Sequence, residues 1–233
     1  MTAIAASAGS PATRQRLYVR AALGVAALVF AGFARSYYLR GFFFHVRAIT
    51  PLVHAHGILM SAWIALFVTQ ALLIARHRPD LHRRLGIAGA ALAPLIVAFG
   101  SLTVAAAIQR RFPEAGPLRF GRIFVEFDGL SLWVFGALVC AALVWRRRPD
   151  VHKRLMLTAT VALLPPAVGR IAEYVLPGSD WDLAIAAATT AAVVVLCAAV
   201  DTLHLKRLHP AMAWGTAAVL TANLLTQLSQ VGD

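Results

Sequence analysis

The chain has 233 residues, of which 60% are hydrophobic, and its mean hydropathy is +0.72. These values exclude an ordinary soluble domain, because one core cannot hide so many apolar side chains and several apolar runs are long enough to cross a bilayer. The formal net charge of +12 would suggest nucleic acid in a soluble protein. Here the basic residues lie between apolar runs, where they set membrane topology, so we expect a lipid bilayer and no nucleic acid as partner.

In chain order, the apolar runs predict an all-α polytopic membrane helix bundle with about seven transmembrane helices. The expected spans cover about 17–34, 51–75, 85–108, 123–145, 155–176, 183–203 and 211–230. Residues 1–16 are expected to form a disordered or interfacial N-terminus, and residues 17–233 a single transmembrane domain. Thr50 followed by Pro51 predicts the start of the second span, and Pro165 with Pro166 predicts a break in the fifth.

Two basic segments, 70 residues apart, share one pattern. Arg-Pro-Asp-x-His-Arg-Arg-Leu begins at Arg78, and Arg-Pro-Asp-x-His-Lys-Arg-Leu begins at Arg148. The same offset aligns Ser61 with Ser131 and Trp63 with Trp133. The sequence therefore predicts a duplicated helix-hairpin core, with repeat 1 at about 51–108 and repeat 2 at about 121–178, related by an axis along the membrane normal.

The repeated turns have a structural explanation. Proline cannot continue the preceding helix, Asp80 and Asp150 can cap the next helix, and the turn arginines can meet anionic lipid headgroups. We expect His82 and His152 at headgroup level beside these acids; the alternative is a paired ligand or proton-sensing role. Because the Arg-rich turns and the N-terminal arginines fall on one side, that side is predicted to be cytoplasmic, with the N-terminus inside and the C-terminus outside.

Ionisable residues also gather at the opposite, outer side, where each is costly if it faces lipid. His54 and His56 lie in the first turns of the second span, about 200° apart around the helix axis. The offset of 70 aligns His56 with Glu126. We expect at least four of six side chains to converge on one polar cavity shared by the two halves, namely His54, His56, Glu126, Asp128, Arg170 and Glu173.

Three interpretations of this cluster compete. A buried polar network can line a proton, ion or solute path, or simply tie the helices together. The second interpretation is a divalent metal ion with redox or hydrolytic activity, bound by His54, His56, Glu126 and Asp128. Against it, no spacing in the sequence places two of these ligands on one helix face. Haem is the third, with His45, His54 or His56 as axial ligand, and it is disfavoured because this half of the core has histidines on one helix only. The sequence favours the polar network and leaves enzymatic activity open.

The motifs also carry a resemblance. Arg40-Gly-Phe-Phe, the stretch Leu52–Gly57 ending in His-Ala-His-Gly, and the two Arg-Pro-Asp-x-His motifs resemble a group of bacterial integral membrane proteins of similar length. The likeness covers about residues 36–175. It implies the bacterial cytoplasmic (inner) membrane as location and implies no particular activity.

Overall fold

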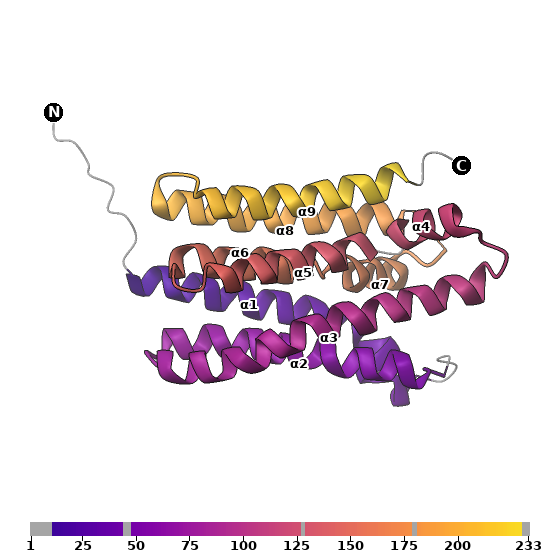
Figure 1. The fold of residues 1–233 in the computed structure, drawn as a ribbon, viewed down its shortest axis with the longest axis horizontal. Coiled ribbons are helices and arrows are strands. Elements are labelled where there is room, and N and C mark those ends of the chain that lie inside the picture. The colour runs from indigo at the N-terminus through magenta and orange to yellow at the C-terminus, as the bar shows by residue number, and fades with distance from the viewer. Residues whose placement is uncertain (1–10, 44–47, 127–128, 179–180, 230–233) are drawn as a thin grey trace.

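The computed structural model describes residues 11–43, 48–126, 129–178 and 181–229, apart from the side chains of 11–14 and 125–126. All regular structure in these residues is helical (Figure 1). The α-helices are α1 (Pro11–Phe33), α2 (Pro51–Ala75), α3 (Pro79–Arg111), α4 (Pro117–Glu126), α5 (Gly129–Val144), α6 (Pro149–Val161), α7 (Pro165–Val175), α8 (Asp182–Leu205) and α9 (Pro210–Leu228). A π-helical turn (Ala34–Tyr38) and a 3₁₀ turn (Arg40–Phe42) follow α1.

Among the described residues, five helical segments are long and apolar enough to cross a membrane, or six if the bent pair α4–α5 counts as one span. The chain is therefore a multi-pass membrane protein. The expected seventh span corresponds to α9, which is helical but is not among these segments. Its run of apolar residues is interrupted by Asn223 and Gln227, which donate to the α8 carbonyls of Ala187 (3.3 Å) and Leu183 (3.2 Å).

Two predictions from the prolines are confirmed. Thr50 caps α2, since its hydroxyl accepts from the Val53 amide at 3.3 Å and Pro51 occupies the first turn. The fifth span is interrupted between the end of α6 at Val161 and the start of α7 at Pro165. Both observations follow from the missing amide proton and the fixed φ of proline.

The predicted capping by aspartate is confirmed for α6, where the Asp150 carboxylate accepts hydrogen bonds from the backbone amides of Asp150 and Val151, and it stays a prediction for Asp80 of α3. The residues at the cap positions are Arg78 and Arg148, and neither side chain makes a capping hydrogen bond. Asp80 and Asp150 lie two residues further along, in the first turn of each helix. A carboxylate there still interacts favourably with the positive end of the helix dipole.

Three hairpin turns lie together at one end of the bundle, which we call the turn end (residues 76–78, 145–148 and 206–209) (Figure 1). The opposite end, with the α1–α2, α3–α4 and α7–α8 connections, is the loop end. The span made by α6 and α7 is central, because 72% of its most apolar window is buried, compared with at most 22% for the spans made by α1, α2, α3 and α8. The core is therefore built around α6–α7 rather than equally around two hairpins, and the internal symmetry stays a prediction.

Helices α1 and α7 approach each other closely at Gly32. A Cβ atom there would collide with the carbonyl group of Ala167, and the Tyr174 hydroxyl donates to the Gly32 carbonyl at 3.3 Å. Gly32→Ala is expected to lower the free energy of unfolding by about 3 kcal/mol, because backbone cannot give way as a flexible side chain does. Gly24→Ala is the control, since nothing lies within 4 Å of a Cβ there. Denaturation in detergent micelles measures both, and equal destabilisation would contradict the close approach.

Candidate functional site

Helix α2 presents His54 and His56 in different directions, as their spacing predicts. His54 is exposed, and its Nδ1 lies 3.2 Å from the hydroxyl of Tyr37 in the π-helical turn. His56 is half-buried, and its Nδ1 is shielded from solvent with no hydrogen-bond partner among the described residues. An imidazole nitrogen without a partner is costly in a bilayer unless water or another polar group reaches it.

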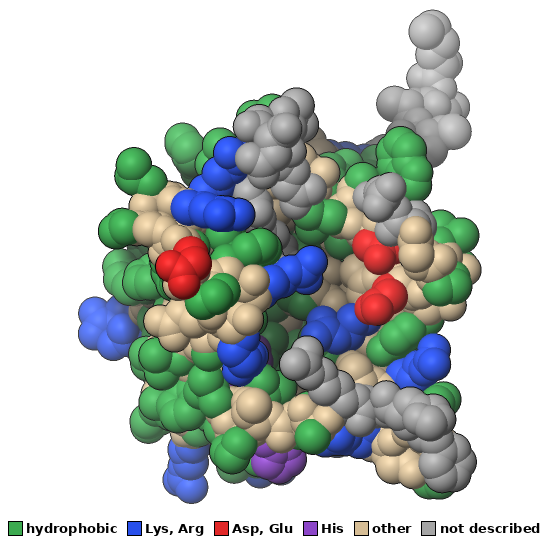
Figure 2. Space-filling view, turned by 90° about the vertical axis from the view of Figure 1, so that its right-hand side faces the viewer, with side chains coloured by type: hydrophobic (Ala, Val, Ile, Leu, Met, Phe, Trp, Pro, Cys, Tyr) green, Lys and Arg blue, Asp and Glu red, His purple; other side chains and the backbone are tan. Residues whose placement is uncertain are grey.

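His56 lines a recess of about 90 Å³ in the loop-end half of the bundle. Three further helices also line the recess. They contribute Gly100 and Thr103 of α3, Ser131 of α5 and Pro166 of α7. Gly100 keeps the recess open, because a Cβ there would lie 3.2 Å from Cε1 of His56 and 2.6 Å from Leu132. The volume suits a few water molecules and is far too small for a porphyrin. The loop end is hollowed near its centre, with basic side chains around the hollow and acidic side chains beside it (Figure 2).

The remaining expected site residues are placed as follows. Arg170 lies on α7, with its guanidinium 4.6 Å from the ring centre of Phe33 and Nη1 donating to the Pro166 carbonyl at 3.2 Å. Glu173 is exposed. Asp128 and the side chain of Glu126 lie outside the described residues. The convergence of at least four of the six side chains therefore stays a prediction.

The metal interpretation depends on Glu126 and Asp128. In the part of the chain that the structure describes, no three His, Cys, Asp or Glu side chains gather closely enough to hold a metal ion. His54 and His56 alone point in different directions and contact different helices. The metal site with His54, His56, Glu126 and Asp128 stays a prediction for this reason.

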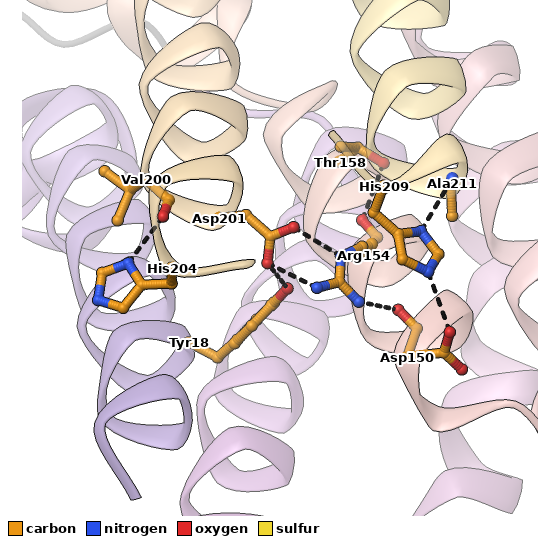
Figure 3. A network of polar contacts seen from close by, with 9 residues as sticks. All are labelled: Tyr18, Asp150, Arg154, Thr158, Val200, Asp201, His204, His209 and Ala211. Carbon is orange, nitrogen blue, oxygen red and sulfur yellow. Dashed lines mark hydrogen bonds and ion pairs between the residues drawn. The ribbon is translucent and has the colours of Figure 1, made fainter. Parts of the chain in front are cut away.

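A second polar cluster lies at the turn end. Arg154 is 1% exposed and forms two hydrogen bonds with Asp201, from Nε to Oδ2 at 2.7 Å and from Nη2 to Oδ1 at 2.8 Å (Figure 3). Tyr18 donates to the same carboxylate at 3.0 Å. The charges of Arg154 and Asp201 are thus paired and hydrogen-bonded, as buried charges must be. The pair joins α6 to α8, and Tyr18 adds α1.

The expectation that the turn arginines meet lipid headgroups is wrong for Arg154. It points into the bundle because Asp201, within the apolar run of α8, requires a positive partner there. The sequence carried a usable signal: an aspartate inside an apolar span calls for a nearby cation. What it did not indicate is which of the many arginines supplies it.

The network extends to α9 through Asp150 and His209. Nη1 of Arg154 donates to the Asp150 carbonyl at 2.5 Å, and Nε2 of His209 lies 3.0 Å from Oδ2 of Asp150 (Figure 3). The amide of Ala211 donates to Nδ1 of His209 at 3.1 Å, so Nδ1 is an acceptor and the ring proton lies on Nε2. His209 therefore donates to Asp150 and caps α9 at the same time.

His82 and His152 lie in contact with each other at the turn end. Their ring centres are 6.2 Å apart with the planes perpendicular, so the two repeated turns bring their histidines together. Asp80 instead lies 3.7 Å from Nε of Arg78, and both side chains are exposed. The expected position of His82 and His152 at headgroup level beside the acids stays a prediction, and the contact between the two rings is the arrangement that the alternative, a paired role, requires.

Comparisons with models of protein families, with curated proteins and with solved structures find no match for this chain. The functional argument rests on the residues described above.

Proposed function

We propose that the chain passes protons across the membrane, and that His56 takes up and releases the proton in the loop-end half. The observation that carries this proposal is the shielded, unpartnered Nδ1 of His56 beside a recess large enough for water. Imidazole can accept and release a proton near neutral pH, and an ionisable residue within a membrane-spanning helix is by default a functional candidate.

Polar groups continue from His56 along the same helix. Trp63 and Gln70 follow at intervals of seven residues, which returns each to nearly the same face of α2. Nε1 of Trp63 donates to Oγ1 of Thr160 at 3.4 Å, and Nε2 of Gln70 donates to the carbonyl of His82 at 3.1 Å. This polar face leads from the recess towards the turn end, where His82 and His152 meet.

Trp63 makes this a gated path. Its side chain is 1% exposed and lies edge-on to Phe135 with ring centres 4.9 Å apart, so the polar face is filled by packed rings between the recess and Gln70. An indole can donate a hydrogen bond but cannot accept a proton, and so cannot relay one. Passage of a proton therefore requires the Trp63 side chain to move and admit water.

The proposal is tested with the purified full chain in liposomes that contain a pH-sensitive dye. With a potassium diffusion potential as driving force, the chain is expected to acidify or alkalise the lumen faster than empty liposomes do. His56→Gln is expected to slow this flux about a hundredfold, because the glutamine side chain still forms hydrogen bonds but cannot take up and release a proton near neutral pH. His204→Gln is the control, since His204 bonds only to its own helix, with Nδ1 2.7 Å from the Val200 carbonyl.

Two results would contradict the proposal. Flux through the unmodified chain that equals the flux of empty liposomes would rule out proton passage. Flux through His56→Gln that equals that of the unmodified chain would rule out His56 as the proton-exchanging group.

A further inference from the structure

The two repeated turns bring His82 of α3 and His152 of α6 together at the turn end. Their ring centres are 6.2 Å apart and the ring planes are perpendicular. Both side chains are half-buried. Two histidines from facing helices therefore share one small, partly shielded space.

The hydrogen bonds settle which nitrogen of each ring is available. Nδ1 of His152 lies 2.8 Å from the carbonyl oxygen of Ala142. Because a carbonyl only accepts, Nδ1 carries a proton and Nε2 of the neutral ring has a free lone pair. Nδ1 of His82 is shielded from solvent and has no hydrogen-bond partner among the described residues. Each ring thus needs one more polar neighbour.

The ring separation indicates what that neighbour is. A direct N–H···N bond between two imidazoles places their centres about 5 Å apart, which is shorter than the distance here. One water molecule that bonds to both rings through contacts of about 2.8 Å places the centres about 6 Å apart. The observed 6.2 Å matches the water-bridged arrangement.

The surroundings disfavour a metal ion as the bridge. Arg83 follows His82 directly and Lys153 follows His152, and Arg146, Arg147 and Arg148 belong to the adjacent turn. Of the nearby acids, Asp150 is already bonded to His209, and Asp80 lies beside Arg78. A divalent cation would meet a field of positive charge here, whereas a neutral water molecule would not.

We propose that one water molecule bridges His82 and His152, and that this unit is the turn-end station of the proton path; the inference rests on the function proposed above. A proton on His82 passes to the water as the water passes one of its own protons to Nε2 of His152. The water is regenerated, His82 becomes neutral, and His152 carries the charge. The bridging water then exchanges with bulk water, which takes the proton from Nε2 and leaves a new water between the rings. Gln70 supports the station because it holds the His82 backbone.

The pair itself is tested by nitrogen NMR of the full chain in nanodiscs, with ¹⁵N-labelled histidine. His152 is expected to show a protonated Nδ1 and an unprotonated Nε2, and His82→Gln is expected to shift the Nε2 resonance. His204→Gln is the control, because Nδ1 of His204 bonds to a backbone carbonyl just as Nδ1 of His152 does. If the chemical shift of His152 Nε2 is the same in His82→Gln as in the unmodified chain, the bridge is contradicted.

The flux assay tests the role of the pair. His82→Gln and His152→Gln are each expected to slow proton flux about tenfold, and the double variant no further, because the rings act as one relay. If His56→Gln stops the flux while both turn-end variants conduct like the unmodified chain, the relay is refuted and the proposed function stands. If the unmodified chain does not conduct, the proposed function and the relay fall together, and the NMR coupling decides the bridge alone.

Discussion

Arg154→Ala is expected to lower the free energy of unfolding by about 3–5 kcal/mol, the range found when one member of a buried ion pair is removed. The substitution leaves Asp201, which is 4% exposed, without its two hydrogen bonds from the guanidinium. The carboxylate then lies buried without its cation, with the Tyr18 hydroxyl still donating to it. Denaturation of the purified chain in detergent micelles, followed by circular dichroism, measures the loss.

Arg84→Ala is the matched control, because Arg84 occupies the same position in the first copy of the motif and is exposed. Its expected effect is within about 0.5 kcal/mol. The double replacement Arg154→Met with Asp201→Leu is expected to recover most of the stability, since apolar side chains of similar size remove both desolvation costs. Equal losses for Arg154→Ala and Arg84→Ala would contradict the buried pair.

The sequence predicted the helices well because hydropathy and proline act locally. Thr50 with Pro51 and the prolines at 165 and 166 marked a helix start and a helix break that the structure contains. The seventh span, α9, is helical as expected but is not among the most apolar segments, and its role as a span stays a prediction. Its polar residues Asn223 and Gln227 are satisfied by α8 carbonyls, which hydropathy along one helix does not reveal. The bend of 67° between residues 117–124 and 129–144 likewise interrupts a run that looked like one span.

In the candidate site, too, local features were predicted and contacts between distant helices were not. Helix periodicity correctly separated His54 from His56, because that depends on rotation per residue alone. The meeting of His82 with His152 and the burial of Arg154 depend on how distant helices pack, and no local pattern carries that information. The sequence repeat predicted two matching hairpins, but α8 and α9 pack on the second copy and α1 packs on both, so equivalent residues differ in burial.

Trp63→Ala tests this difference in burial most directly, and it is expected to lower the free energy of unfolding by about 3–5 kcal/mol. Trp63 is 1% exposed, packs edge-on against Phe135 and donates to Thr160, so its removal leaves a cavity and an unpaired hydroxyl acceptor. Lipid cannot fill such a cavity, and the lost dispersion contacts are not replaced.

Trp133→Ala is the control, because Trp133 is the equivalent residue of the second copy and is 57% exposed. A lipid-facing tryptophan has few protein contacts to lose, so the expected change is below about 1 kcal/mol. Both variants are unfolded by the same detergent titration, with the four remaining tryptophans of each variant as the fluorescence probe. If Trp133→Ala costs as much as Trp63→Ala, the two equivalent tryptophans are equally packed, and the burial of Trp63 against Phe135 and Thr160 is contradicted.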